Sequence, residues 1–146
     1  MSYDLAVFDP SVAPRGREEF RAWYRLQTRW SEGHGYNDPA VSTLPLQAWF
    51  FAMIKEFPAL NGPHATENVD SDMIADYSVG RNFIYVGFAW RLAERAYAGT
   101  FRLANKYRVG FFNVSSNEGE VWLPDPGGGL NLSFKVMFEK ERPNNG

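Results

Sequence analysis

The chain has 146 residues, and its 45% of apolar and 22% of charged residues are typical of one globular domain rather than of a disordered segment. Fifteen basic residues stand against 17 acidic ones without a basic block, which excludes the electrostatic signature of a nucleic-acid-binding protein. There is no cysteine, which excludes a disulfide scaffold, a thiol nucleophile and a cysteine metal site.

The N-terminus, MSYDLAVFDP, has neither a basic region nor a long apolar core, so we expect no signal peptide. The longest strongly apolar run, at residues 83–90, is too short to span a bilayer. We therefore expect a cytoplasmic protein that binds neither a membrane nor a nucleic acid.

The first part of the chain predicts one strand and two helices. Residues 3–8 alternate between two apolar faces, which predicts a short, buried strand. Apolar residues recur at helical spacing over residues 14–30 and again over residues 42–57. The turn-forming string EGHGYNDP at residues 32–39 predicts a loop between these helices.

Residues 58–73 form a long segment without periodicity. They include His64 and the acids Glu67, Asp70 and Asp72. So long a connection without secondary structure is uncommon in an ordered domain. It is either a mobile flap or part of a functional site, and the sequence leaves both alternatives open.

Residues 76–124 carry the densest pattern in the chain. Weak alternation over residues 74–79 leads through a turn into residues 83–88, which are apolar on both faces, as in a central strand. Residues 89–107 predict an amphipathic helix, and residues 109–123 predict a hairpin.

Residues 1–124 are expected to form a single domain, and residues 125–146 a separate C-terminal segment. Three glycines at 127–129 predict a flexible link, and residues 130–138 alternate as in a strand. This strand either completes the same sheet or is an arm exchanged between two copies in a homodimer. The tail ERPNNG is expected to be disordered.

The order of these elements predicts an α+β fold. Its core order, βαββαβ, is that of the ferredoxin-like, or split-βαβ, arrangement. Right-handed crossovers would place the helices on one face of an antiparallel sheet, with the first and third strands at its centre. One helix and the C-terminal strand are additions to this core.

Three strings resemble a group of small bacterial proteins without an established function: MSYDLAVFDP, DYSVGRNFIY and VGFFNVSSNEGEVWLP. The resemblance covers residues 1–124 and leaves the tail unmatched. It implies no activity, no cofactor and no catalytic residue. Small α+β proteins of this kind in bacteria are sometimes immunity partners of secreted toxins.

Four residues in or beside the predicted loops suggest a pocket for a small ligand. His34 and His64 are the two histidines, and both have carboxylates near them in the sequence. Asp76 and Arg81 flank the turn between two predicted strands, where Arg81 could meet a small anion. The histidines lack a fixed metal-binding spacing, and there is no phosphate loop and no GxSxG motif. We therefore expect no metal and no cofactor, and we name no catalytic residue.

Exposed aromatic and acidic residues suggest a second candidate, a protein-binding surface. Trp122 alternates with two apolar neighbours in its strand, which places it outward if those neighbours are in the core. Glu118 and Glu120 lie beside it, and Tyr36 lies in an earlier loop. Outward aromatic residues with acidic neighbours are typical of protein-binding patches.

The sequence therefore favours a protein-interaction domain, with an immunity-type partner as one form of it, over an enzyme. Its partner would be another protein, and acidic residues would steer a basic surface onto it. The alternative is a small-ligand-binding protein or enzyme with a loop pocket around His34, His64 and Arg81. Homodimerisation through the C-terminal arm is a third alternative.

Overall fold

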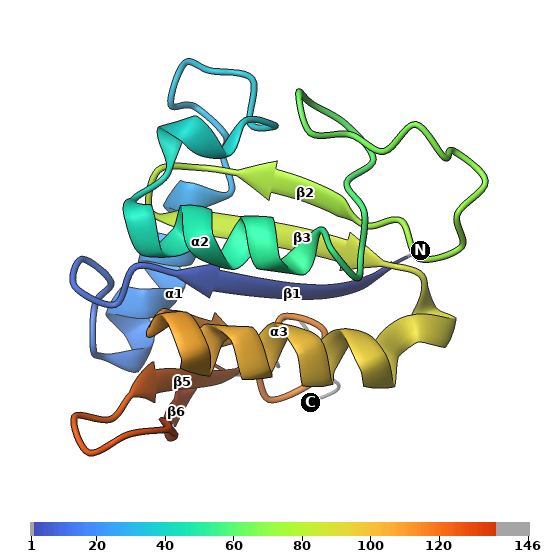
Figure 1. The fold of residues 1–146 in the computed structure, drawn as a ribbon. Helices are drawn as coiled ribbons and strands as arrows, with labels where there is room; N and C mark the ends of the chain where they lie inside the picture. Colours follow the sequence, from blue (N-terminus) through green and yellow to red (C-terminus); the bar gives the residue numbers. More distant parts are fainter. Residues whose placement is uncertain (1, 137–146) are drawn as a thin grey trace, which may run out of the picture.

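The computed structural model describes residues 2–136 and contains one antiparallel sheet of six strands in the order β2-β3-β1-β4-β5-β6 (Figure 1). The strands are β1 (Tyr3–Phe8), β2 (Asp76–Val79), β3 (Phe83–Phe88), β4 (Gly110–Phe112), β5 (Glu120–Pro124) and β6 (Leu130–Lys135). The α-helices are α1 (Arg17–Gln27), α2 (Leu44–Met53) and α3 (Ala93–Tyr107), and the short 3₁₀ turns are η1 (Pro39–Val41) and η2 (Trp90–Leu92). The α+β class predicted from the sequence is confirmed.

Strand β1 lies inside the sheet and is buried on both of its faces. It pairs with β3 on one side and with β4 on the other. Its four consecutive residues from Leu5 to Phe8 are 0% exposed. Because successive side chains of a strand point to opposite faces, such a run requires an apolar layer on each face of the sheet.

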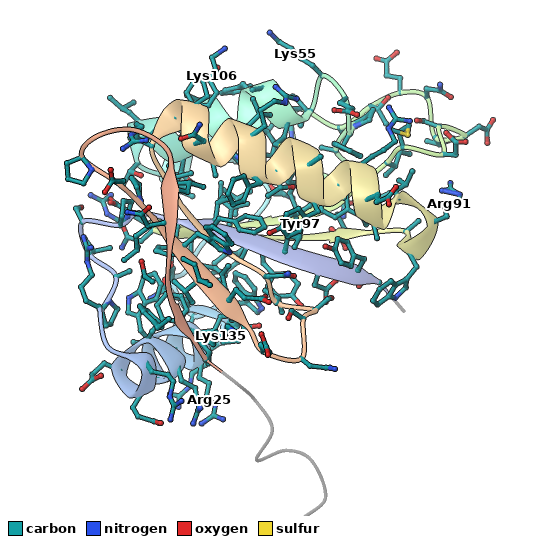
Figure 2. The ribbon with its side chains drawn as sticks, turned by 90° about the horizontal axis from the view of Figure 1, so that it is seen from below. Arg25, Lys55, Arg91, Tyr97, Lys106 and Lys135 are labelled. Carbon is teal, nitrogen blue, oxygen red and sulfur yellow. The ribbon has the colours of Figure 1, made fainter. Side chains whose placement is uncertain are left out.

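The helices supply these two layers from opposite sides. The sequence placed the helices of the core on one face and left the additional helix without a face. Helices α2 and α3 pack with Leu5 and Val7 in one hydrophobic core. Helix α1 packs with Ala6 and Phe8 in another. Figure 2 shows α1 on one side of the sheet and α3 on the other. We call these layers the α1 face and the α2/α3 face.

The connection between β1 and β2 explains this arrangement. It contains two helices, and one of them is sufficient for the crossover from β1 to β2. Helix α2 makes the crossover on the face that α3 also covers. This leaves α1, with its own stripe of Phe20, Trp23 and Tyr24, to cover the opposite face.

Aromatic rings fill the α1 face. The ring centroid of Phe20 lies 5.2 Å from that of Phe8, 5.3 Å from that of Phe112 and 5.5 Å from that of Phe134. All three pairs meet edge to face, the arrangement that the ring quadrupoles favour. Part of the high aromatic content of the sequence therefore serves the packing of this layer.

Strand β6 pairs with β5 of the same chain, so the described part of the C-terminal segment belongs to this sheet. Phe134 and Val136 pack into the α1 face. The guanidinium of Arg21 donates a hydrogen bond to the main-chain carbonyl of Val136 at 2.5 Å. The rest of the predicted strand and the predicted disordered tail, residues 137–146, lie outside the described residues.

A β-bulge interrupts the pairing of β5 with β6. Leu132 stands opposite Trp122, but Phe134 stands opposite Val121, so Ser133 is an extra residue on β6. Beyond the bulge the side chains change faces. Leu132 therefore lies on the opposite face from Phe134; it is 45% exposed, whereas Phe134 packs into the α1 face.

The helices are shorter than the sequence patterns predict. The predicted helix at residues 14–30 is the helix Arg17–Gln27, and Trp30 has a left-handed backbone with a φ of 54°, which a helix cannot contain. The helix predicted over residues 42–57 ends at Met53. Among residues 2–136, no helix is both long enough and apolar enough to cross a bilayer.

We expect Phe20→Ala to lower the free energy of unfolding by about 3–5 kcal/mol, because removal of a fully buried ring between the helix and the sheet leaves a cavity. Leu26→Ala is the control on the same helix. Leu26 is 52% exposed, so its truncation should change stability by less than about 0.5 kcal/mol. Denaturant titration measures both values, and equally small effects would contradict the packing of α1 on the sheet.

Candidate functional site

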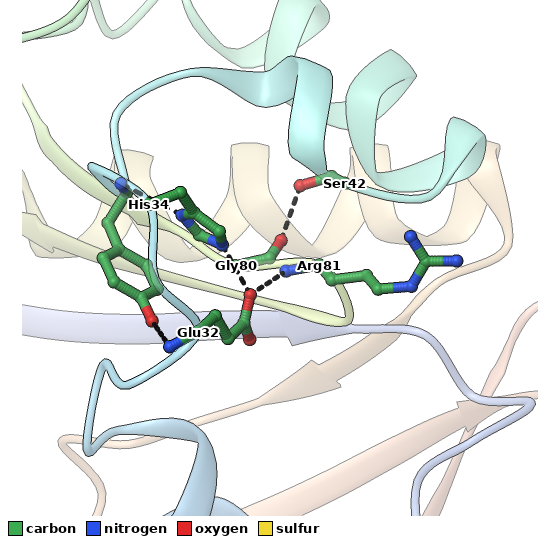
Figure 3. Close-up of polar contacts among 6 residues, drawn as sticks. Glu32, His34, Ser42, Gly80 and Arg81 are labelled. Carbon is green, nitrogen blue, oxygen red and sulfur yellow. Dashed lines mark hydrogen bonds and ion pairs between the residues drawn. The ribbon is translucent and has the colours of Figure 1, made fainter.

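A cluster of hydrogen bonds connects the loop after α1 with the turn between β2 and β3 (Figure 3). Oε1 of Glu32 lies 2.6 Å from Nε2 of His34 and accepts a hydrogen bond from the main-chain N–H of Arg81 at 3.0 Å. The main-chain N–H of Glu32 donates to the hydroxyl of Tyr36. We call these four residues the Glu32 staple.

Neighbouring contacts hold the turn from its other side. The hydroxyl of Ser42 donates to the carbonyl of Gly80 at 2.6 Å. The main-chain N–H of Thr43 donates to the carbonyl of Arg81 at 3.1 Å. The main chain of Arg81 is therefore fixed at both its N–H and its carbonyl, and its side chain extends from a rigid point.

The contacts of His34 define its role. Its Nδ1 lies 3.3 Å from the main-chain N–H of Tyr36, which can only donate, so Nδ1 is the acceptor. The ring proton is then on Nε2 and is donated to Glu32. Both ring nitrogens are engaged, and a general base or a metal ligand needs a free lone pair. His34 thus has a structural role in the staple.

An open cleft of about 560 Å³ lies beside the staple, and we call it the Arg81 cleft. Glu32 and His34 form one side, and Ala40 and Val41 of η1 provide apolar surface. Arg81 is exposed, and Figure 3 shows its guanidinium pointing away from Glu32. No residue in the range 2–136 forms an ion pair or a hydrogen bond with that guanidinium.

The four residues of the predicted ligand pocket do not form one site. His34 and Arg81 line the Arg81 cleft, whereas His64 and Asp76 do not. The ring of His64 instead packs edge-on against Phe51, with 4.8 Å between centroids. Asp76 lines a separate pocket at the other end of the β2–β3 hairpin.

Trp122 does not face outward as the sequence suggested. It does lie on the opposite strand face from Val121 and Leu123, but helix α3 covers that face as well. The indole ring meets the ring of Phe101 edge to face at 5.1 Å. Its Nε1 is buried without a hydrogen-bond partner among the described residues. The alternation along β5 predicted correctly that Trp122 lies on the face opposite Val121 and Leu123. It could not predict that helix α3 covers this face as well.

The other residues of the predicted partner surface either contact neighbouring groups of the same chain or lie far from Trp122 in the sheet. Glu118 forms an ion pair of 2.8 Å with Lys135, which raises the pKa of that lysine. Glu120 is partly buried, and its Oε1 is enclosed. The carbonyl of Tyr36 accepts a hydrogen bond from Val79 on β2, four strands away from β5 in the sheet. These residues therefore do not form one acidic aromatic patch.

A second, smaller pocket of about 150 Å³ lies where β1 and β2 begin and β3 ends. Asp4 and Asp76 line it together with Ser78 and Tyr85. Asp4 accepts hydrogen bonds from the hydroxyls of Tyr85 and Ser2, the latter at 2.5 Å. Burial and the contact with Asp4 raise the pKa of Tyr85, so its hydroxyl stays protonated as a donor. We call this the Asp4 pocket.

The long loop between α2 and β2 adds further carboxylates at the same end of the sheet (Figure 1). Glu67, Asp70 and Asp72 are exposed, and none of them forms an ion pair within residues 2–136. Two nearby arginines form no ion pair with these carboxylates. Arg91 donates to the main-chain carbonyl of Asp72 rather than to its carboxylate, and Arg95 pairs with Glu56 at 3.0 Å. We call this region, with Asp4 and Asp76, the acidic end.

Sequence reasoning missed Asp4, Tyr85 and Glu32 as site residues. The signal for Asp4 was present, because it is a charged residue in a strand that is otherwise buried on both faces. The signal for Glu32 was weaker, since an exposed loop carboxylate has no periodicity to mark it. Within residues 2–136, no three histidine, aspartate or glutamate side chains converge as a metal site would require.

Comparison with protein-family models, curated proteins and solved structures found no match for this chain. Its likeness to small bacterial proteins therefore stays a prediction from the three sequence strings.

We expect Glu32→Ala to destabilise the staple by about 1–3 kcal/mol, because His34 and the Arg81 amide lose their acceptor. Hydrogen exchange of the Arg81 amide should become markedly faster. Glu32→Gln is the matched control, since its carbonyl oxygen can still accept from Arg81, and it should exchange at close to the wild-type rate. Equal protection of that amide in all three proteins would contradict the staple.

We expect Trp122→Phe to preserve stability within about 1 kcal/mol, because phenylalanine keeps an edge contact with Phe101 and removes a buried N–H without a partner. Trp122→Ala should lower the free energy of unfolding by about 2–4 kcal/mol through the cavity that it leaves. Thermal or denaturant unfolding distinguishes the two. A neutral Trp122→Ala would instead indicate an exposed side chain.

Proposed function

We propose that this chain is a noncatalytic protein-interaction domain that binds a basic surface of its partner through the acidic end. The observation that carries this proposal is a set of five carboxylates at one end of the sheet that lack an ion-pair partner among residues 2–136: Asp4, Glu67, Asp70, Asp72 and Asp76. Away from this end, Glu18 and Glu118 each form an ion pair with a neighbouring base.

The geometry of this end suits a protein partner. The carboxylates of the loop are exposed and repel one another weakly in water, so a partner's lysines and arginines would relieve that repulsion. Val69 in the same loop is 77% exposed and offers apolar contact area. The Asp4 pocket has room for one extended side chain at the rim of such an interface.

The engagement of His34 favours binding over catalysis. Its two ring nitrogens are used by the staple, and His64 lies on the surface beside Phe51. An acid–base mechanism near neutral pH needs a group with a suitable pKa beside a pocket. In this proposal the protein acts by occluding a surface of its partner, as an immunity protein does to a toxin.

We also propose that the β2-β3-β1-β4 part of the sheet, with α2 and α3, is a ferredoxin-like core. The antiparallel strand order and the position of both helices on one face support this assignment. Helix α1, β5 and β6 would be additions to it. A cytoplasmic location accords with the absence of cysteine. Strand β6 pairs with β5 of its own chain, which does not support an exchanged arm. Homodimerisation through an exchanged β6 therefore stays a prediction.

We expect the double variant Asp72→Asn, Asp76→Asn to associate about tenfold more slowly with its partner, because electrostatic steering accounts for increases of this order. Its association rate should also depend less on salt concentration. Candidate partners are basic proteins encoded beside its own gene, and surface plasmon resonance at two ionic strengths measures the rates.

The charge-matched control is Glu19→Gln, Glu118→Gln, which removes two acids away from the acidic end. This control should bind at the wild-type rate. Equal association rates for the wild type and the acidic-end variant would refute the proposed surface. If only the control associates more slowly, the binding surface lies instead at the hairpin around Glu118.

A further inference from the structure

The Arg81 cleft lies at the opposite end of the β2–β3 hairpin from the acidic end, and its lining has a different chemistry. It is not part of the surface proposed above. Three of its polar side chains have no hydrogen-bond partner within the described residues: the guanidinium of Arg81 and the amides of Gln27 and Asn82. Polar side chains without partners in the lining of a concave site are typical of a ligand-binding pocket.

We propose that the Arg81 cleft binds a small organic carboxylate, with the guanidinium of Arg81 holding the carboxylate group. A guanidinium presents parallel N–H donors that match the two oxygens of a carboxylate. The amide groups of Gln27 and Asn82 can donate further hydrogen bonds at the same cleft. Alanine and valine side chains at positions 40 and 41 can contact an apolar group that carries the carboxylate.

The main chain that carries the Arg81 side chain is already held in place. The main chain of Arg81 is fixed by hydrogen bonds to Glu32 and from Thr43, so the side chain has a rigid origin. Less freedom is then lost when a ligand binds than for an arginine on a mobile loop. The cleft of about 560 Å³ is also much larger than a single carboxylate group and can hold the body that bears it.

The charge of the cleft favours a monoanion over a dianion. Glu32 contributes a negative charge to the wall, while Arg81 contributes the positive one. A carboxylate can pair with Arg81 while Glu32 remains hydrogen-bonded to His34 and to the Arg81 amide. The second charge of a phosphate group would be repelled by Glu32.

The test uses the isotope-labelled full chain and side-chain resonances of Arg81, Gln27 and Asn82 in NMR titrations. The probes are butyrate and phenylacetate, their primary amides, inorganic phosphate, and the peptide Ala-Ala-Val with either a free C-terminus or a C-terminal amide. We expect saturable shifts with carboxylates and affinities at least tenfold weaker for the matched amides and for phosphate.

Arg81→Gln should weaken carboxylate binding at least tenfold, and Arg102→Gln on the exposed face of α3 is the matched control that should leave it unchanged. Arg81→Gln retains the main-chain contacts of the turn, so an unaltered amide spectrum elsewhere verifies the fold.

The free acids and the peptide acid distinguish two sources of the same group. Binding of butyrate or phenylacetate alone identifies a small-molecule ligand, and binding of the peptide acid alone identifies a protein C-terminus. Three results would each overturn the proposal: no shift with any carboxylate, amides that bind as tightly as acids, or full binding by Arg81→Gln.

Discussion

Burial of β1 on both faces is the constraint on which the rest of the structure depends. Four consecutive residues from Leu5 to Phe8 are inaccessible to solvent, and β1 is hydrogen-bonded on each side to β3 and β4. Neither helical layer alone could exclude water from such a strand, because each covers alternate side chains. The α1 face and the α2/α3 face therefore stabilise each other through a shared strand. The aromatic rings follow from the same requirement, since they fill the space between helix and sheet on both faces.

Coverage of both faces limits where function can lie. A sheet with helices on each side leaves its strand ends, its edges and its loops for contact with other molecules. The two candidate sites are at opposite ends of the β2–β3 hairpin, with Arg81 at its turn and Asp76 at its open end. Strand β3 has six residues, which corresponds to about 20 Å at the usual rise per residue. One short hairpin thus separates the Arg81 cleft from the acidic end, so ligands proposed for the two sites would not contact each other.

The periodicity of the sequence predicted the helices and strands well. It predicted poorly which side of the sheet each helix covers and which side chains are exposed. The strands Tyr3–Phe8 and Phe83–Phe88 have the bounds that their apolar runs predict, and each helix lies inside its predicted range. Periodicity describes one element at a time, however, and does not say which side of the sheet a helix covers. That is why the sequence left the additional helix without a face and why Trp122 was expected to be exposed. The bulge at Ser133 is a similar case, because an uninterrupted alternation in the sequence predicts one face for residues that the register divides between two.

The same distinction applies to the candidate site at His34. The sequence shows a histidine two residues from a carboxylate, and this spacing is equally compatible with a reactive pair and with a structural one. What decides between them is the second ring nitrogen, and its partner is the amide of Tyr36. That contact exists because Tyr36 has a left-handed backbone with a φ of 58°, which costs roughly 1–2 kcal/mol for a residue other than glycine. The ring contacts of Tyr36 with Trp30 and His34, and its hydroxyl bond to Glu32, offset this cost. No local pattern in the sequence encodes such a conformation, since it depends on how the side chains of the folded loop pack against one another. Residue types could therefore indicate that His34 belongs to a polar cluster near Arg81, but only the backbone of the loop shows that both ring nitrogens of this histidine are engaged in holding the loop.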